Sequence, residues 1–96
     1  MPAKSLAFGQ APSISTSSAI NLPNIPANTG LGAQYTVIAV ETAGIRWRDD
    51  GTDPTSTVGM PISSGQSFAY TGDPNRIRII GQTAGAIIDV TYFVGP

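Results

Sequence analysis

The stretch Ala86–Val94, AIIDVTYFV, is the most hydrophobic candidate strand of this 96-residue chain and carries apolar side chains at both odd and even positions. Side chains alternate between the two faces of a strand. One face would therefore hold Ile88, Val90, Tyr92 and Val94, and the other Ile87, Asp89, Thr91 and Phe93. A strand that is apolar on both faces is typically covered on both sides. The stretch thus predicts a strand covered either by the chain's own N-terminal arm or by another subunit.

Upstream of this stretch, short apolar or alternating segments recur at spacings of roughly 8–12 residues, separated by Gly, Pro, Asn and Asp. We expect strands at residues 33–41, 45–48, 58–62, 66–71 and 76–81, before the last one at 86–94. Pro61 confines its strand to a sheet edge or a bulge, because proline cannot donate a ladder hydrogen bond. No segment has a helical period of comparable length. The pattern predicts an all-β fold, an antiparallel β-sandwich or small barrel of jelly-roll-like type.

Residues 1–32 differ from the rest of the chain. They are rich in proline and small polar residues, and they carry almost no charge beyond Lys4. Isolated apolar residues interrupt this segment without a helical period, which favours an ordered segment over a free tail. We predict an extended N-terminal arm at 1–32, with a possible edge strand near residues 13–22, followed by a β-sandwich core at 33–96.

The composition excludes several classes of function. Only 11% of residues are charged and the net charge is -1, which argues against nucleic-acid binding and suits permanent association. Without cysteine or histidine the chain lacks the commonest metal ligands and the commonest general base. No apolar segment has the length of a secretory signal or a membrane span. We therefore expect no catalytic residues, no metal, no cofactor and no membrane partner, and synthesis in a cytosol.

The segment Ile45–Pro54, IRWRDDGTDP, concentrates charge around the single tryptophan. Its three aspartates, Asp49, Asp50 and Asp53, lack the spacing of a calcium loop, although a weak metal site or a catalytic carboxylate pair remains an alternative. Asp-Gly and Asp-Pro are common in turns, because the Asp side chain accepts hydrogen bonds from nearby backbone N–H groups. The preferred interpretation is therefore a strand that runs into a turn.

Four arginines occur in pairs two residues apart, so the members of each pair share a strand face. These are Arg46 with Arg48 and Arg76 with Arg78. If the two strands are neighbours, the four side chains form one positive patch. The patch either pairs with nearby aspartates or docks an acidic protein partner, since arginine is favoured at interfaces. We assign these arginines, together with the apolar Leu6, Phe8 and Phe93, as candidate protein-interface residues.

The block IRWRDDGTDPTSTVGMPISSGQSFAYTGDPNRIRIIGQTAGAIIDVTYF resembles a pattern found in small structural proteins of tailed bacteriophages and prophages. The pattern is an arginine–aromatic–arginine–Asp-Asp-Gly-Thr string followed by Gly-Met-Pro, an aromatic strand and a final Val-Thr-Tyr strand. It covers roughly residues 34–94 of this chain.

This resemblance implies a virion component, a capsid decoration or cement protein made in the bacterial cytoplasm that binds the outside of the phage head. Proteins of this kind are small, β-rich and often trimeric, so the implied partners are the major capsid protein and further copies of the chain. An alternative function is a fibre- or tail-associated module that binds host glycans through Trp47 and the neighbouring aspartates.

Overall fold

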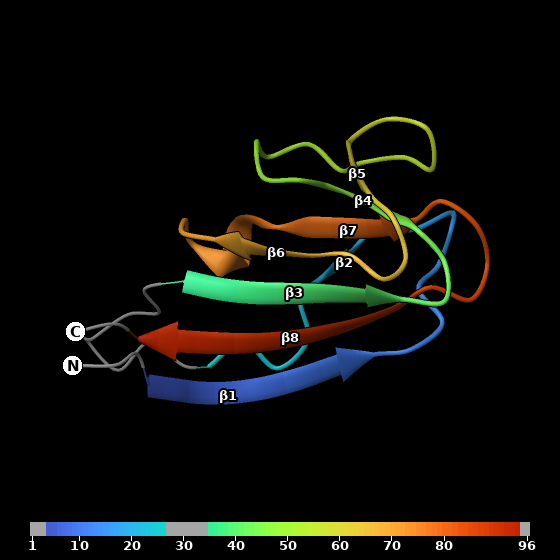
Figure 1. Cartoon of the computed structure of the whole chain (residues 1–96). Helices are drawn as coiled ribbons and strands as arrows, with labels where there is room; N and C mark the ends of the chain where they lie inside the picture. The colour runs from blue at the N-terminus through green and yellow to red at the C-terminus, as the bar shows by residue number, and fades with distance from the viewer. Residues whose placement is uncertain (1–3, 27–34, 95–96) are drawn as a thin grey trace.

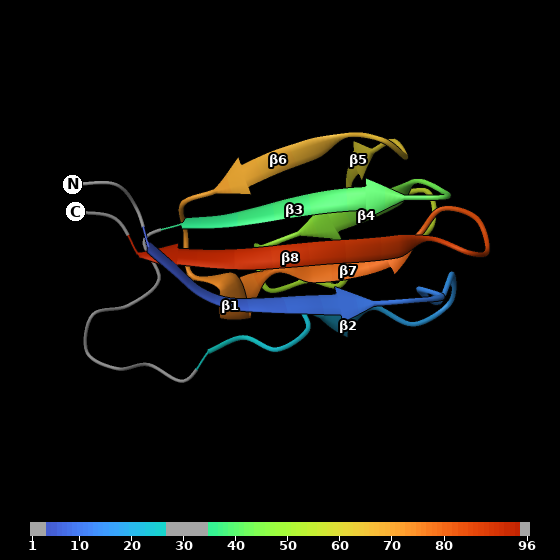
Figure 2. The ribbon, with the colours of Figure 1, turned by 60° about the horizontal axis from the view of Figure 1, so that its bottom comes forward.

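Eight strands form two four-stranded antiparallel sheets that pack face to face (Figures 1 and 2). This computed structural model describes residues 4–26 and 35–94. The elements are β1 (Lys4–Ala11), β2 (Ile20–Asn21), β3 (Tyr35–Glu41), β4 (Ile45–Arg48), β5 (Met60–Ile62), β6 (Ser67–Tyr70), the 3₁₀ helix η1 (Pro74–Arg76), β7 (Arg78–Gly81) and β8 (Ile87–Val94). No helix in these residues is both long and apolar enough to cross a membrane.

The strand order confirms the predicted all-β sandwich. Sheet A has the order β1-β8-β3-β6 and sheet B the order β2-β7-β4-β5. Successive strands therefore alternate between the two sheets, except for β4 and β5, which are neighbours in sheet B. This arrangement is that of an eight-stranded jelly roll, a double-sheet fold that occurs in viral capsid domains and in lectins.

The hydrophobic core lies between the sheets and follows the alternation of the strands. In sheet A, Ile38 of β3 pairs with Val90 of β8, and both are fully buried. In sheet B, Ile45 of β4 and Ile79 of β7 are equally buried. In β3 and β8 every second residue is buried, so the intervening residues point to the outside of the sandwich, whereas β7 buries Ile79, Ile80 and Gly81 in succession. That geometry creates the two outer faces considered below.

Part of the predicted arm belongs to the sandwich. Of residues 1–32, positions 1–3 and 27–32 lie outside the described residues, whereas Lys4–Ala11 is a full strand that pairs with β8 at the edge of sheet A. The Tyr92 hydroxyl donates to the Pro23 carbonyl at 2.6 Å, which ties the segment after β2 to β8. The sandwich therefore begins at β1, and not at residue 33 as predicted. A strand within 13–22 is present only as the two-residue β2.

Two prolines bear on the strand predictions, one within an edge strand and one in a turn. Pro61 lies in β5, which is an edge strand of sheet B, as its missing N–H predicts. The strand predicted at 76–81 is shorter and begins at Arg78. The difference arises because Asp73 accepts a hydrogen bond from Asn75 N at 2.9 Å and Pro74 occupies the first position, which continues the turn into η1.

Candidate interaction surfaces

The predicted interface residues lie on opposite sides of the sandwich. Phe8 and Phe93 belong to the outer face of sheet A, because their cross-strand partners Thr91 and Tyr35 alternate with the buried residues of β8 and β3. The arginines belong to sheet B and to the turn that precedes β7. The predicted interface residues therefore form two separate groups, an apolar one on sheet A and an arginine one on sheet B, and not a single surface.

The outer face of sheet A carries a group of apolar residues, and we call it the apolar face, although Ser5, Gln10 and Ser67 also point to this side. It is formed by the outward side chains of Phe8, Tyr35, Val37, Ala39, Ala69, Ile87, Thr91 and Phe93, which are exposed or half-buried. Phe8 is 58% exposed, and the rings of Tyr35 and Phe93 stack with centroids 4.9 Å apart. Leu6, at 36% exposure, lies in a β-bulge of β1 between Ser5 and Ala7. A sheet face in contact with water usually carries polar residues.

The described part of the chain thus covers only one face of β8. Its inner face packs in the core, while Ile87 and Phe93 on its outer face stay half-buried. The sequence left open whether the arm or another subunit covers this outer face. The described part of the arm pairs with the edge of β8 as β1 and does not lie over that face.

The charged groups of the apolar face lie at one of its ends. Asp89 of β8 accepts a hydrogen bond from Gln10 Nε2 at 2.7 Å, and Glu41 ends β3 close by. A hydrogen bond to Asp89, together with the negative charge of that residue, raises the pKa of Glu41 above its usual value. Neither carboxylate has an ion-pair partner among the described residues. The Tyr35–Phe93 stack marks the opposite end.

Three of the four arginines share the outer face of sheet B, as the spacing predicted. β4 and β7 are neighbours, Arg48 lies directly opposite Arg78, and Arg46 lies on the same face. Arg76 is in η1 instead of the strand, and its Nε donates to the Asp49 carbonyl at 3.1 Å. Whether this surface docks a partner stays a prediction.

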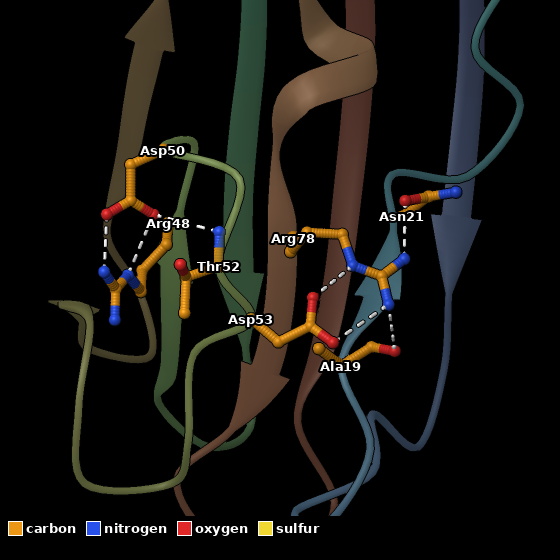
Figure 3. Close-up of polar contacts among 7 residues, drawn as sticks. All are labelled: Ala19, Asn21, Arg48, Asp50, Thr52, Asp53 and Arg78. Carbon is orange, nitrogen blue, oxygen red and sulfur yellow. Dashed lines mark hydrogen bonds and ion pairs between the residues drawn. The ribbon is translucent and has the colours of Figure 1, made fainter.

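The loop between β4 and β5 folds back over this face and contacts all three strand arginines. Figure 3 shows its contacts with Arg48 and Arg78. Arg46 donates to the carbonyl oxygens of Ser56 and Gly59, at 3.2 and 2.9 Å. Arg48 donates to Asp50, with Nε and Oδ1 3.0 Å apart. The loop therefore supplies the acceptors that let like charges lie side by side on neighbouring strands.

The second acidic residue of the loop extends this network to the N-terminal segment. Arg78 donates to Asp53 Oδ1 at 2.8 Å, and also to Asn21 and to the Ala19 carbonyl. The hydrogen bonds from the arginines lower the pKa of both Asp50 and Asp53. Pairing with nearby aspartates was one of the two roles expected of the arginine patch, and Asp50 and Asp53 supply it in addition to their place in the loop. The short spacing of Arg48 and Asp50 could have indicated their ion pair from the sequence. Arg78 and Asp53 are 25 residues apart, so no local pattern indicated theirs.

Trp47 of β4 packs between the two sheets, against the edge strand β6 of sheet A. Its indole ring stacks on Phe68 of β6 with centroids 5.3 Å apart, and it meets Tyr70 edge to face. The Tyr70 hydroxyl donates to Asp49 Oδ2 at 2.7 Å, and burial, followed by this contact, raises the pKa of Tyr70 to about 12.

A shallow groove of about 380 Å³ lies beside Trp47 on the surface of sheet B. It is lined by Trp47, Arg48, Asp49, Asp50, Val58, Gly59 and Met60. Val58 and Met60 are exposed apolar residues, at 51% and 58%. The groove combines an aromatic side chain with carboxylates, although one ring face of Trp47 is taken by Phe68.

Within the described residues, no group of three or more Asp, Glu, His or Cys side chains is placed to hold a metal ion. Comparison of the chain with protein-family models, with curated proteins and with solved structures finds no match. The surfaces themselves are therefore the basis for the functional proposal.

Proposed function

We propose that this protein is a structural component of a tailed-phage virion, a decoration or cement protein that binds the outside of the head and stabilises it. Its partners are the major capsid protein and further copies of itself. The sequence resemblance over residues 34–94 supports the virion assignment. The jelly roll is compatible with it, although the same fold also serves lectins, and a fold alone does not select a function.

The observation that carries the proposal is the presence of two unlike surfaces on opposite sides of one small sandwich. Phe8 and Val37 belong to an open apolar face on sheet A, whereas the loop-covered arginines belong to sheet B. A protein that strengthens a shell must contact the shell and also its own copies or a second part of the shell. Many modest contacts of this kind add up through multivalency.

The direct test is binding of the purified protein to expanded heads assembled without it. Saturable co-sedimentation and a higher dissociation temperature of the decorated heads are expected. In the same assay, Arg76→Glu reverses an exposed charge beside the arginine surface and is expected to weaken binding, while Ser64→Glu, in the exposed turn after β5, serves as the control. Failure to bind heads, together with absence of the protein from purified virions, would reject the proposal.

The groove beside Trp47 favours a second candidate, a fibre- or tail-associated module that binds host glycan. Aromatic rings contact sugars through their faces, and Asp50 is an exposed acceptor at the rim. Titration with bacterial surface saccharides should then shift the fluorescence of Trp47, which is the single tryptophan of the chain. An unchanged emission spectrum at saturating sugar would exclude a glycan site at this groove.

A further inference from the structure

We propose that the apolar face of sheet A is the surface through which two copies of this chain pair, face to face and with their strands antiparallel. The inference rests on the self-association included in the proposed function and assigns it a surface and a geometry. It starts from the outward side chains of four strands that lie side by side (Figure 2).

The first argument is the chemistry of the face. Phe8, Val37 and the stacked pair Tyr35–Phe93 lie near one another over β1, β8 and β3, with Thr91 between Phe8 and Val37. Exposed apolar regions of this kind on small soluble domains mark contact sites, because burying them removes unfavourable water contact. The low charge of the chain leaves little electrostatic repulsion to keep copies apart.

The second argument is the size of the face. Strands about 4.8 Å apart and about seven residues long, at about 3.4 Å per residue, give a four-stranded patch of roughly 450 Å² on each copy. Two such patches bury close to the roughly 1,000 Å² in total that a specific interface needs. The area therefore predicts a weak, reversible pair and not a permanent dimer.

The third argument concerns orientation. Glu41 and Asp89 lie at one end of the face without an ion-pair partner among the described residues. A parallel pair would place these carboxylates against their own copies, which is unfavourable. An antiparallel pair places them over the opposite end, where the Tyr35 hydroxyl is a hydrogen-bond donor.

Pairing through the edge of β1 is less favourable than pairing through the face. The Phe8 carbonyl, which an added strand would need, already accepts a hydrogen bond from Asn24 Nδ2 at 2.7 Å. The bulge at Leu6 also interrupts the regular spacing of the edge. Both features are known to protect exposed strands from strand addition.

The pair is tested by sedimentation equilibrium of the intact protein at roughly micromolar to millimolar concentrations. A monomer–dimer equilibrium is expected. Phe8→Lys and Ala69→Lys, on the two edge strands of sheet A, should each raise the dissociation constant by roughly tenfold or more. Met60→Lys is the matched control, because Met60 has the same 58% exposure as Phe8 but lies on sheet B. It should leave the equilibrium unchanged.

Orientation is tested with single cysteines, which the natural chain lacks. Packed sheets lie about 10 Å apart, too far for a disulfide, so a thiol cross-linker of about that length is used. Thr91→Cys, near the centre of the face, should cross-link to its own copy. Glu41→Cys, at the acidic end, should not. Self-cross-linking of Glu41→Cys would overturn the antiparallel arrangement.

The remaining outcomes separate this inference from the proposed function. A protein that stays monomeric, a dimer weakened by Met60→Lys alone, or a trimer would overturn the two-fold pair. Head binding by a monomeric protein would leave the proposed function standing, whereas pairing without head binding would reject the function and keep the pair. Circular dichroism shows whether each lysine variant is folded. If Phe8→Lys does not fold, the dissociation constant of Ala69→Lys alone tests the pairing face.

Discussion

At the scale of single residues, two buried polar atoms stand out against an otherwise apolar core. Thr36 is fully buried on the inner face of β3, and its hydroxyl oxygen has no hydrogen-bond partner among the described residues. The same holds for the indole nitrogen of Trp47. Tyr92, in contrast, is fully buried but bonds the Pro23 carbonyl. Burial of an unpaired hydroxyl lowers the stability of the folded state, because the hydroxyl loses its hydrogen bonds to water, whereas burial of the neighbouring isoleucines and valines carries no such cost.

Replacing this hydroxyl by a methyl group should therefore stabilise the protein. Thr36→Val keeps the β-branched shape that suits a strand and is expected to raise the free energy of unfolding by about 1 kcal/mol. Urea denaturation followed by circular dichroism measures the change. Thr36→Ser keeps the hydroxyl, loses the methyl group and should destabilise. A less stable Thr36→Val protein would mean that the hydroxyl has a partner in solution.

At the scale of elements, the loop between β4 and β5 is held against sheet B by hydrogen bonds and ion pairs from arginine side chains. Its backbone accepts from Arg46, and its carboxylates accept from Arg48 and Arg78. Buried Pro54 adds a small apolar contact. Because the ion pairs are exposed, their contribution depends on salt and pH more than the packing of the sheets does.

Acid should therefore loosen this loop before the sheets separate. The pKa values of Asp50 and Asp53 are lowered in the folded state, so their stabilising effect is complete above the ordinary value of 3.8 and is lost as the pH falls below it. Glu41 affects stability with the opposite sign. The hydrogen bond with Asp89 and the charge of that residue raise the pKa of Glu41 in the folded state, so protonation of Glu41 on acidification favours folding. The protection factors of the loop amides, which correct for the pH dependence of intrinsic exchange, should therefore fall as the pH drops below 3.8.

The double variant Asp50→Asn/Asp53→Asn is the control for this pH dependence. It cannot titrate at either position, so the protection factors of its loop amides should already be lower at pH 5 and should change less with pH. Equal pH dependence in the variant and in the natural protein would show that the two aspartates do not hold the loop.

At the scale of the whole molecule, β1 is part of the sandwich and not an appendage. It pairs with β8 over most of its length, and Ala7 and Ala11 pack against the core. Removing it would leave β8 as an edge strand and uncover core side chains on that side. The chain from residue 33 onward is therefore not a complete sandwich.

Deleting residues 1–12 is accordingly expected to destabilise the protein by several kcal/mol, because both the β1–β8 ladder and its apolar burial are lost. At about 4–8 °C per kcal/mol for a domain of this size, the melting temperature should fall by roughly 15 °C or more. Differential scanning calorimetry measures it, with deletion of residues 1–3 as the control. An unchanged melting temperature would show that the sandwich does not need β1.

The sequence by itself determined most of the strands and the chemistry of their faces. The two-sided apolar pattern of Ala86–Val94, the edge position of Pro61 and the shared face of Arg46 and Arg48 all follow from the two-residue period of a strand, which is a local property. The strand expected at 76–81 begins two residues later, because the 3₁₀ helix η1 precedes it, which local spacing did not indicate.

Only the tertiary structure decided which segments meet. It places β1 beside β8, Asp53 against Arg78, and the predicted apolar and arginine residues on opposite faces. These contacts join residues far apart in the chain and depend on how the jelly roll orders its strands, which local spacing does not specify. The open outer face of sheet A is likewise a property of the assembled sheet, because no single strand shows whether its neighbours leave that face uncovered.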